Sequence, residues 1–192
     1  MIRLRPMNRT DLGDSFCCMN DIETARLINR NPVMTYARHV SWFETAIRNT
    51  ARVLLTIEDD NGKYIGTCGF NHIDHRKRQA EIWIAIDKYS RGVGYGISAT
   101  EALLQYGFLG MDFSLIYLHV LARNIPAINL YTKLGFRKTD KTLEYRGPNC
   151  MPEQSFRMEL RRNAYHRTEF APNYTQTAER DNSLSAQQER NY

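Results

Sequence analysis

The feature that most constrains the fold is a strand-like stretch followed at once by a glycine-rich loop and a helical pattern. In the range Glu81–Ile86, isoleucine occupies every second position, which is typical of a strand with different side chains on its two faces. The loop that follows has three glycines within the five residues Gly92–Gly96. Ile97, Leu104 and Phe108 then recur at helical spacing. The segment therefore predicts a strand, a glycine loop and a helix.

The start of this predicted helix is a natural binding site for an anion. The first backbone amides of a helix have no partner within it, and the helix dipole is positive at that end. Glycines let an anion approach the backbone, and Arg91 adds a full positive charge. We therefore predict a phosphate or pyrophosphate site, with simple turn glycines as the alternative. The spacing fits neither a Walker loop nor the first unit of a dinucleotide-binding fold.

Two motifs resemble those of the GNAT N-acetyltransferases. Arg91, Gly94 and Gly96 match the family's Arg/Gln-x-x-Gly-x-Gly/Ala signature for acyl-CoA, and Asn124–Phe136 is similar to its second hallmark. The two motifs occur in the family's order and at its separation, so together they are more specific than either alone. The resemblance covers about residues 2–160. Within it, the stretches M-N-D-I-E and H-V-S-W-F resemble the branch that includes ribosomal-protein N-terminal, polyamine and amino-sugar acetyltransferases.

The resemblance implies an α/β fold of the α+β kind, the GNAT fold. Its central sheet is mixed but mostly antiparallel, with about six to seven strands and about four flanking helices. The residue patterns add detail: Asn61-Gly62 predicts a hairpin between two strand-like runs, and Ser41–Glu44 predicts a capping box that begins a helix. Asn124 and Pro126 predict the start of a later helix, and Gly135 predicts its end.

Length and composition fit one domain with a sizeable core, since the chain has 192 residues of which 42% are hydrophobic. We predict an acetyltransferase domain over residues 1–162 and a polar, disordered tail over 163–192. The charged N-terminal residues are unlike a secretory signal and no apolar run approaches a membrane span, so we expect a cytoplasmic protein without a membrane partner. The four cysteines show neither zinc nor disulfide spacing, and no metal site is predicted.

The charge of the chain is basic, with a formal net charge of +5 and a pI near 9.1. Such a charge would suit an acidic partner, but the basic residues are scattered apart from the cluster His75–Arg78. That cluster lacks the interleaved aromatic residues of a single-strand binder, so nucleic acid is not a predicted partner. A monomer or a homodimer is expected.

Acetyl-CoA is the cosubstrate that the resemblance implies. The backbone near Ile84–Ile86 would pair with the amides of pantetheine like an added strand, and the amides of residues 93–96 would hold the pyrophosphate. Asn124 has a second interpretation as a simple helix cap. The candidate cofactor-binding residues are Ile84, Ala85, Ile86, Arg91, Gly92, Val93, Gly94, Tyr95, Gly96, Asn124, Ala127 and Tyr131.

Two side chains are candidates for catalysis. Glu81 is a carboxylate in an otherwise apolar strand, which is costly unless the group is paired or used, and many relatives have a Glu base at the matching place. Its alternative is an edge position that faces solvent or pairs with Arg or Lys. Tyr131 matches the tyrosine that protonates the departing thiolate in the family, with core packing as its alternative. A lone histidine in a strand or loop is more often structural, so neither His72 nor His119 is assigned as a base.

The acceptor is predicted to be a primary amine that attacks the thioester directly, in a ternary complex and without a covalent intermediate. Candidate substrate-binding residues are Asn71, His72, Asp74 and Glu81. An amino sugar, including a nucleotide-linked one, or another small amine is one hypothesis, and the N-terminus of a ribosomal or other protein is the alternative. A polyamine is less favoured, because a chain of charge +5 lacks an obvious acidic patch. A hypothesis from another class is a non-catalytic acyl-CoA-binding module, against which the presence of both Glu81 and Tyr131 argues.

Overall fold

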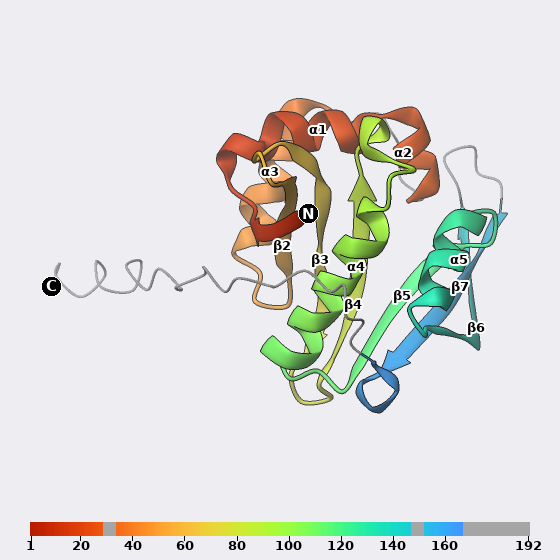
Figure 1. Ribbon diagram of the computed structural model, residues 1–192. Helices are drawn as coiled ribbons and strands as arrows, with labels where there is room; N and C mark the ends of the chain where they lie inside the picture. The colour runs from red at the N-terminus through yellow and green to blue at the C-terminus, as the bar shows by residue number, and fades with distance from the viewer. Residues whose placement is uncertain (29–33, 147–151, 167–192) are drawn as a thin grey trace, which may run out of the picture.

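The computed structural model describes residues 1–28, 34–146 and 152–166, which form one sheet covered by helices on both faces (Figure 1). Its strands are β1 (Ile2–Pro6), β2 (Val53–Asp59), β3 (Tyr64–Asp74), β4 (Gln79–Ile86), β5 (Leu115–Leu121), β6 (Arg137–Arg146) and β7 (Pro152–Arg161). Its α-helices are α1 (Leu12–Asn20), α2 (Ile22–Leu27), α3 (Tyr36–Ile47), α4 (Tyr95–Gln105) and α5 (Ile125–Lys133).

The sheet has seven strands in the order β1-β2-β3-β4-β5-β7-β6. Every neighbouring pair is antiparallel except β4 and β5, which run parallel. This confirms the predicted mixed, mostly antiparallel sheet. The structure describes five α-helices where about four were expected, and the shortest of them is α2, a six-residue helix capped by the side chain of Asp21.

The alternation of β4 sorts its side chains between two helical layers. Ile82, with Ile84 beside it, belongs to the main core beneath α4 and α5, which cross the near face of the sheet in Figure 1. Trp83 packs on the opposite face against α3, and Ala85 packs there against α1. The period-two pattern read from the sequence is thus a strand buried on both faces, between helices of different composition.

The predicted hairpin is confirmed at the turn between β2 and β3. Gly62 has a φ of 76°, a left-handed conformation that favours glycine, and its amide donates to the carbonyl of Asp59. The Asp59 carboxylate accepts from the backbone amides of Asn61 and Lys63, both at 2.9 Å. Side-chain and backbone bonds therefore close this turn together.

The predicted start of a helix at Ser41 is wrong. Helix α3 begins at Tyr36, and Thr35 caps it by accepting a hydrogen bond from the amide of Arg38 at 3.3 Å. Ser41 lies inside the helix, and Glu44 forms an ion pair with Arg9 instead of reaching back to a cap. Both Ser41 and Thr35 offer a capping hydroxyl, but the earlier start adds the buried His39 to the packed face of the helix.

The beginning of α5 agrees with the sequence. The Asn124 side chain caps it by accepting from the amide of Ala127 at 3.2 Å, Pro126 lies in the first turn, and Gly135 follows the end with a φ of 89°. Of the predicted tail, residues 167–192 lie outside the described part of the chain. Within the described ranges, no helix combines the length and the apolar character needed to cross a membrane.

Candidate active site

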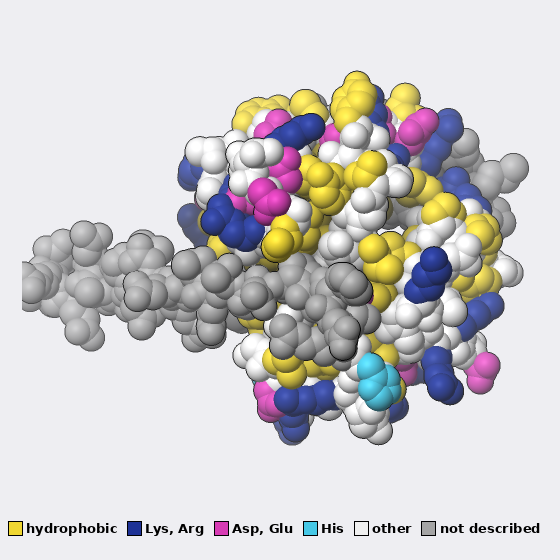
Figure 2. Space-filling model, viewed as in Figure 1, with side chains coloured by type: hydrophobic (Ala, Val, Ile, Leu, Met, Phe, Trp, Pro, Cys, Tyr) yellow, Lys and Arg dark blue, Asp and Glu magenta, His cyan; other side chains and the backbone are white. Residues whose placement is uncertain are grey.

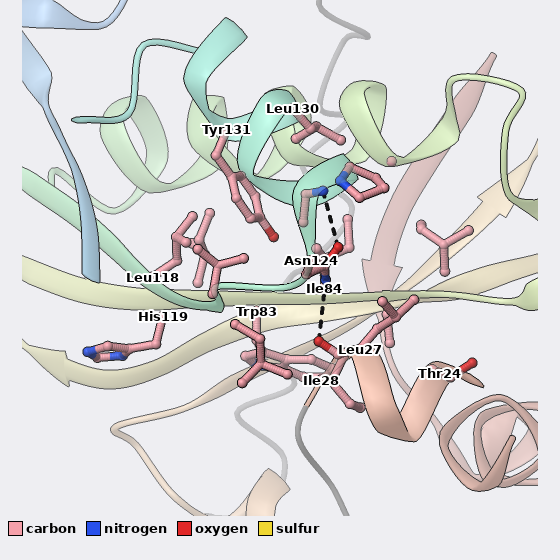
Figure 3. A pocket seen from close by; sticks show the side chains of 18 of the residues that line it. Thr24, Leu27, Ile28, Trp83, Ile84, Leu118, His119, Asn124, Leu130 and Tyr131 are labelled. Carbon is pink, nitrogen blue, oxygen red and sulfur yellow. Dashed lines mark hydrogen bonds between the residues drawn. The ribbon is translucent and has the colours of Figure 1, made fainter. Parts of the chain in front are cut away.

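A cleft opens in the middle of the sheet where β4 and β5 part. Within the described residues, only the segment 79–81 of β4 pairs with β5, where it lies opposite the segment 115–117. Beyond this point β4 stays paired with β3, and β5 stays paired with β7, so the two strands diverge. The divergence leaves a cavity of about 560 Å³ and exposes one edge of β4 to it (Figure 3).

The walls of this cavity come from the two strands, the glycine loop, α2 and α5. The strands and their neighbours contribute Asn71, Glu81–Ile86, Leu118–Leu121 and Ser155. The helices and loops contribute Thr24, Leu27, Ile28, Arg91, Gly92, Gly94, Gly96, Ile97, Asn124, Pro126, Ala127, Leu130 and Tyr131.

The glycine loop adopts the backbone conformation that an anion site needs. Gly92 and Gly94 have φ values of 79° and 94°, which side chains disfavour. Gly94 is the N-cap residue of α4 and provides no side-chain cap, so the first amides of α4 are available to a ligand. The side chains of Val93 and Tyr95 do not line the cavity, and the contribution that we predict for these residues is therefore through their backbone.

Arg91 lies in the cavity wall, but it is already engaged by its own protein. Its Nε donates to the carbonyl of Ile86 at 3.1 Å, its guanidinium bonds the hydroxyl of Thr24, and Nη1 lies 3.6 Å from the carboxylate of Glu23. Lys88, just before the loop, forms a second ion pair with the start of α2: its ammonium lies 3.2 Å from the carboxylate of Asp21. The cations of the loop thus fasten it to α2, a role that the sequence did not indicate.

Asn124 connects α5 to α2 across the cavity. Besides capping α5, its Nδ2 donates to the carbonyl of Leu27 at 3.3 Å (Figure 3), and Arg123 donates to the carbonyl of Arg26 at 2.8 Å. The cap interpretation of Asn124 describes one of its two bonds. The other bond makes α2 part of the cavity wall.

Tyr131 has its ring in the core and its hydroxyl in the cavity. The ring lies edge-on to Phe136 with centroids 5.7 Å apart, while the hydroxyl points into the cavity in Figure 3. Burial raises the pKa of this phenol above its ordinary value near 10. Tyr131 therefore stays protonated at neutral pH, as a proton donor must.

Glu81 is the last residue of β4 that pairs with β5, and it stands opposite both Asn71 and Tyr117. Its Oε1 lies 2.6 Å from Nδ1 of His119, and its Oε2 lies 3.5 Å from Nε2 of His72. The side chain is 17% exposed. Among the described residues, the side chains in contact with this carboxylate are thus two imidazoles, not the Arg or Lys of the alternative interpretation.

The predicted substrate-binding residues separate into two groups. Asn71 lines the cavity and His72 lies beside Glu81. Asp74 does not line the cavity: its carboxylate accepts from the amide of Lys77 at 2.9 Å and pairs with the ammonium of the same residue. Asp74 therefore shapes the turn between β3 and β4, because an Asp at a turn bonds the backbone a few residues on.

Comparison with known proteins identifies the family. Residues 2–137 match the acetyltransferase (GNAT) domain. The chain belongs to the GNAT acetyltransferase family. It is 29% identical over 149 residues to an N-acetyltransferase of Bacillus licheniformis, covering 75% of this chain and 83% of the relative. It is 28% identical over 135 residues to the spermidine N(1)-acetyltransferase of Escherichia coli, covering 70% and 72% of the two chains.

Solved structures of this family share the fold. A crystal structure of spermidine N-acetyltransferase from Vibrio cholerae in complex with CoA and spermine matches with a TM-score of 0.81 at 24% identity. The match covers 85% of this chain and 97% of the Vibrio chain. The GNAT fold and the family predicted from the two motifs are thereby confirmed. The resemblance to ribosomal-protein or amino-sugar acetyltransferases is not confirmed, because the two relatives named here by their substrate are spermidine acetyltransferases.

The present protein is therefore an acetyl-CoA-dependent N-acetyltransferase, with acetyl-CoA as its cosubstrate. The family assignment goes against the non-catalytic acyl-CoA-binding module. Within the described part of the chain, no group of three or more His, Cys, Asp or Glu residues is arranged to hold a metal ion.

His119 is a cavity residue that the sequence analysis considered but did not assign to the site. Tyr117 is the residue of β5 that pairs with Glu81. His119 lies two positions further along the strand, so its side chain is on the same face of β5 as that of Tyr117. That signal becomes usable only when β4 and β5 are known to be parallel neighbours in a given register. The sequence alone did not contain this information.

Proposed function

We propose that this GNAT acetyltransferase acetylates a primary alkylamine and that a polyamine such as spermidine is its acceptor. The observation that carries the proposal is the position of Glu81. It is the only acidic side chain that lines the cavity among the described residues, and it lies where the two strands begin to part. An alkylamine is mostly protonated at neutral pH, because its pKa is roughly 10. A carboxylate there can attract the ammonium group and then take its proton.

The choice of a polyamine is supported by the relatives. The Escherichia coli enzyme, 28% identical over 70% of this chain, is a spermidine N(1)-acetyltransferase. The net charge of the chain alone made a polyamine the less favoured acceptor, and this proposal replaces that expectation. Figure 2 shows that Lys and Arg side chains on one face are spread among Asp and Glu, so a net charge of +5 does not describe every part of the surface.

The proposed reaction uses two protein groups that both line the cavity, Glu81 and Tyr131. The amine nitrogen attacks the thioester carbonyl carbon after Glu81 has taken its proton. The carbon–sulfur bond then breaks, and the departing thiolate receives a proton from Tyr131. The attacking nitrogen, which still carries one proton more than the amide product, gives that proton back to Tyr131, so the net result is one proton held by Glu81. The exposed edge of β4 beyond Glu81 supports the proposed pairing of Ile84–Ile86 with pantetheine, because this edge has no strand partner within the described cavity wall.

A second candidate is an amine with a single positive charge, such as an amino sugar or a peptide N-terminus. It is favoured by the composition of the chain around α2 and α3. From residue 24 to residue 43 the sequence contains three arginines and no Asp or Glu. Thr24 and Leu27 of α2 line the cavity together with Ile28 at the C-cap of this helix, and none of the three offers a carboxylate to a second ammonium group. Glu23 of α2 does not line the cavity and lies beside Arg91.

The test is the release of CoA thiol from acetyl-CoA with a panel of amines. The panel contains spermidine, spermine, a monoamine of matching length, glucosamine, a nucleotide-linked amino sugar and an N-terminal peptide. The polyamine proposal predicts a kcat/KM for spermidine at least about tenfold above that of the matched monoamine, which corresponds to about 1.4 kcal/mol. Equal values for spermidine and the monoamine would favour the second candidate.

A variant then tests the role of Glu81. Glu81→Gln keeps the shape of the side chain but removes the charge and the base, so it should lower kcat/KM by roughly 100-fold, in the range for general-base catalysis. The matched control is Glu101→Gln on α4, a residue outside the cavity wall. A Glu81→Gln enzyme as active as the control would refute the assignment of the base.

A further inference from the structure

Three ionisable side chains from three adjacent strands meet at Glu81. His119 on β5 bonds one carboxylate oxygen at 2.6 Å, and His72 on β3 lies 3.5 Å from the other. Glu81 and His119 are mostly buried, with 17% and 18% of their side chains exposed, whereas the His72 side chain is 69% exposed. The cluster therefore runs from the cavity wall to the surface.

His72 faces Glu81 because of a bulge in β3. Asn71 stands opposite Glu81 and Asp74 opposite Gln79, so two residues of β3 face the single residue Ala80. Ile73 takes the buried position in the core, and His72 has a left-handed φ of 50°. Such a conformation costs a non-glycine residue roughly 1–2 kcal/mol and is kept where the surroundings impose it. Bulges are frequent next to active sites, where they re-aim a side chain.

His119 is held by a different set of contacts. It lies on the same face of β5 as Tyr117, whose ring is perpendicular to the imidazole at 5.8 Å. Its Nδ1 can donate to an ionised Glu81, which would fix the rotation of the carboxylate and leave Oε2 directed toward His72. His119 also lines the cavity. This is the geometry of a residue that orients a base.

We propose that His119 positions Glu81 and that His72 passes the acceptor's proton from Glu81 to solvent. This inference rests on the proposed function, because it describes how the same base is reset. The proton leaves the amine nitrogen for a Glu81 oxygen, moves to Nε2 of neutral His72, and the resulting imidazolium loses one proton to water. Glu81 is then ionised again for the next turnover. One proton enters the cluster and one leaves it, so no further reactant is needed.

The other charged groups near the cluster are already paired. Arg157 on β7 lies 3.6 Å from the ring centroid of Tyr117 and pairs with Glu159 at 2.8 Å. Asp74 on β3 pairs with Lys77 at 3.4 Å. Burial, and then the charge of Glu81, raise the pKa of the Tyr117 phenol, which therefore stays neutral. Among the described residues, the ionisable side chains in contact with the Glu81 carboxylate are therefore the two histidines.

The test of His72 is chemical rescue, measured with the amine of the panel that the wild type acetylates fastest. His72→Gln should lower kcat by about tenfold at low buffer concentration, and imidazole buffer should restore it in proportion to its concentration. The KM for acetyl-CoA should not change. The control is His75→Gln, since His75 is an exposed residue of the turn between β3 and β4. A His72→Gln rate equal to wild type in every buffer would overturn the relay.

The test of His119 is rescue by a conservative variant. His119→Ala should lower kcat by about tenfold or more and alter the pH profile, and His119→Asn should recover part of the loss because its amide can also donate to Glu81. Equal losses in the two variants with unchanged pH profiles would show that His119 has only a structural role.

A measurement without turnover separates this inference from the proposed function. In NMR spectra, Glu81→Gln should shift the ring resonances of His72 and His119 but not those of His75. Unshifted His72 and His119 resonances would overturn the cluster even if an acceptor is found. Silence of the wild type with every amine of the panel would instead overturn the proposed acceptor class, while shifted resonances would still support the cluster.

Discussion

At Tyr131, one side chain serves two environments. Its ring is buried beside Phe136 and its hydroxyl is directed into the cavity (Figure 3). Burial disfavours the phenolate and raises the pKa of the phenol, so the proton is retained through the physiological range. The packing interpretation and the proton-donor interpretation are therefore compatible, because they concern different atoms of the same residue.

Tyr131→Phe should lower kcat by roughly 100-fold while the Kd for acetyl-CoA stays within about twofold of wild type. The variant keeps the packed ring and loses only the hydroxyl, which is the proposed proton donor. Because the pKa is raised, wild-type activity should show no loss from Tyr131 ionisation below about pH 10. The measurements are thiol release from pH 6 to 10 and calorimetric binding, with Tyr89→Phe, an exposed tyrosine, as the control. A Tyr131→Phe enzyme with normal kcat would contradict the assignment.

Asp11 is the centre of a buried polar network that joins β1, β2 and the start of α1. Its carboxylate accepts two bonds from Arg5 at 2.7 Å, one from the amide of Asn8 at 2.9 Å and one from the Thr56 hydroxyl at 2.8 Å. Burial alone would raise the pKa of Asp11, but these hydrogen bonds and the charge of Arg5 outweigh it and lower the pKa. The same guanidinium also bonds Glu58.

Asp11→Asn should reduce the free energy of unfolding at pH 7 by about 2–3 kcal/mol, because Arg5 loses a buried charge partner. A carboxyl whose pKa is lower in the folded state stabilises the protein above its unfolded value of 3.8, and this contribution disappears as the pH falls through the folded value. The wild type should therefore lose more stability than the variant between about pH 4 and pH 2. Urea unfolding at several pH values measures this, and parallel curves would contradict it.

At the scale of elements, the glycine loop requires glycine at residue 94 because of its backbone conformation, not because neighbouring atoms leave no room for a side chain. An added Cβ at Gly94 would meet no atom within 4 Å, yet the φ of 94° disfavours any side chain. Gly13 in α1 is equally open, but no left-handed conformation is required there. A side chain has room at both positions, so a comparison of the two substitutions measures the effect of backbone strain at Gly94.

Gly94→Ala should destabilise the fold by about 1–2 kcal/mol and weaken acetyl-CoA binding, because the loop would turn the first amides of α4 away from the ligand. Gly13→Ala should be neutral or should stabilise by up to about 1 kcal/mol, since alanine loses less entropy in a helix. Thermal unfolding and calorimetry measure both effects. Equal stability and affinity for the two variants would contradict the role given to the loop.

Helix α3 shows how an element can begin away from the strongest local motif. Ser41–Glu44 has the letters of a capping box, but the helix is capped by Thr35, more than one turn before Ser41. The longer helix presents His39, Phe43 and Ala46 on one buried face, with Phe43 and Ala46 packed near Leu54. Since tertiary packing supplies most of the stability of a short helix, the buried face decided where this one starts.

At the scale of the whole molecule, an aromatic contact lies beyond the last strand. The ring of Tyr165 lies 5.0 Å from that of Phe108, a fully buried core residue. The predicted boundary at residue 162 would separate these two rings. We propose that the packed unit includes Tyr165 and that residues 167–192, which are rich in polar side chains, add little to its stability.

Truncation after His166 should leave the melting temperature within about 2 °C of the full chain, whereas truncation after Arg161 should lower it by roughly 4 °C or more through loss of the aromatic contact. Calorimetry of the two shortened chains measures the difference. If both truncations lower the melting temperature equally, residues 167–192 contribute to the fold and the proposal is wrong.

Oligomeric state also belongs to this scale. One structure of the Vibrio cholerae spermidine N-acetyltransferase, with a TM-score of 0.73 to this chain, is dodecameric. The expectation of a monomer or homodimer for the present enzyme stays a prediction, which sedimentation of the full chain would test.

Local sequence was sufficient for the features whose partners lie within a few residues. The Asn61-Gly62 turn, the alternation of β4, the loop from Gly92 to Gly96 and the Asn124 cap are all of this kind. Their geometry depends on backbone conformation and short-range bonds, which the residue types specify directly. The two family motifs lie in these same segments, and this explains why they could be recognised.

The long-range pairings were decided only when the strands came together. Glu81 meets His119, which is 38 positions away, because β4 and β5 are parallel neighbours, and it meets His72 because a bulge in β3 turns that residue toward it. Arg91 binds the hydroxyl of Thr24, 67 positions away, for the same kind of reason. A strand's sequence shows which residues share a face, but not which strand lies beside it or in which register. The protonation chemistry proposed for this enzyme therefore depends on contacts that only the folded sheet creates.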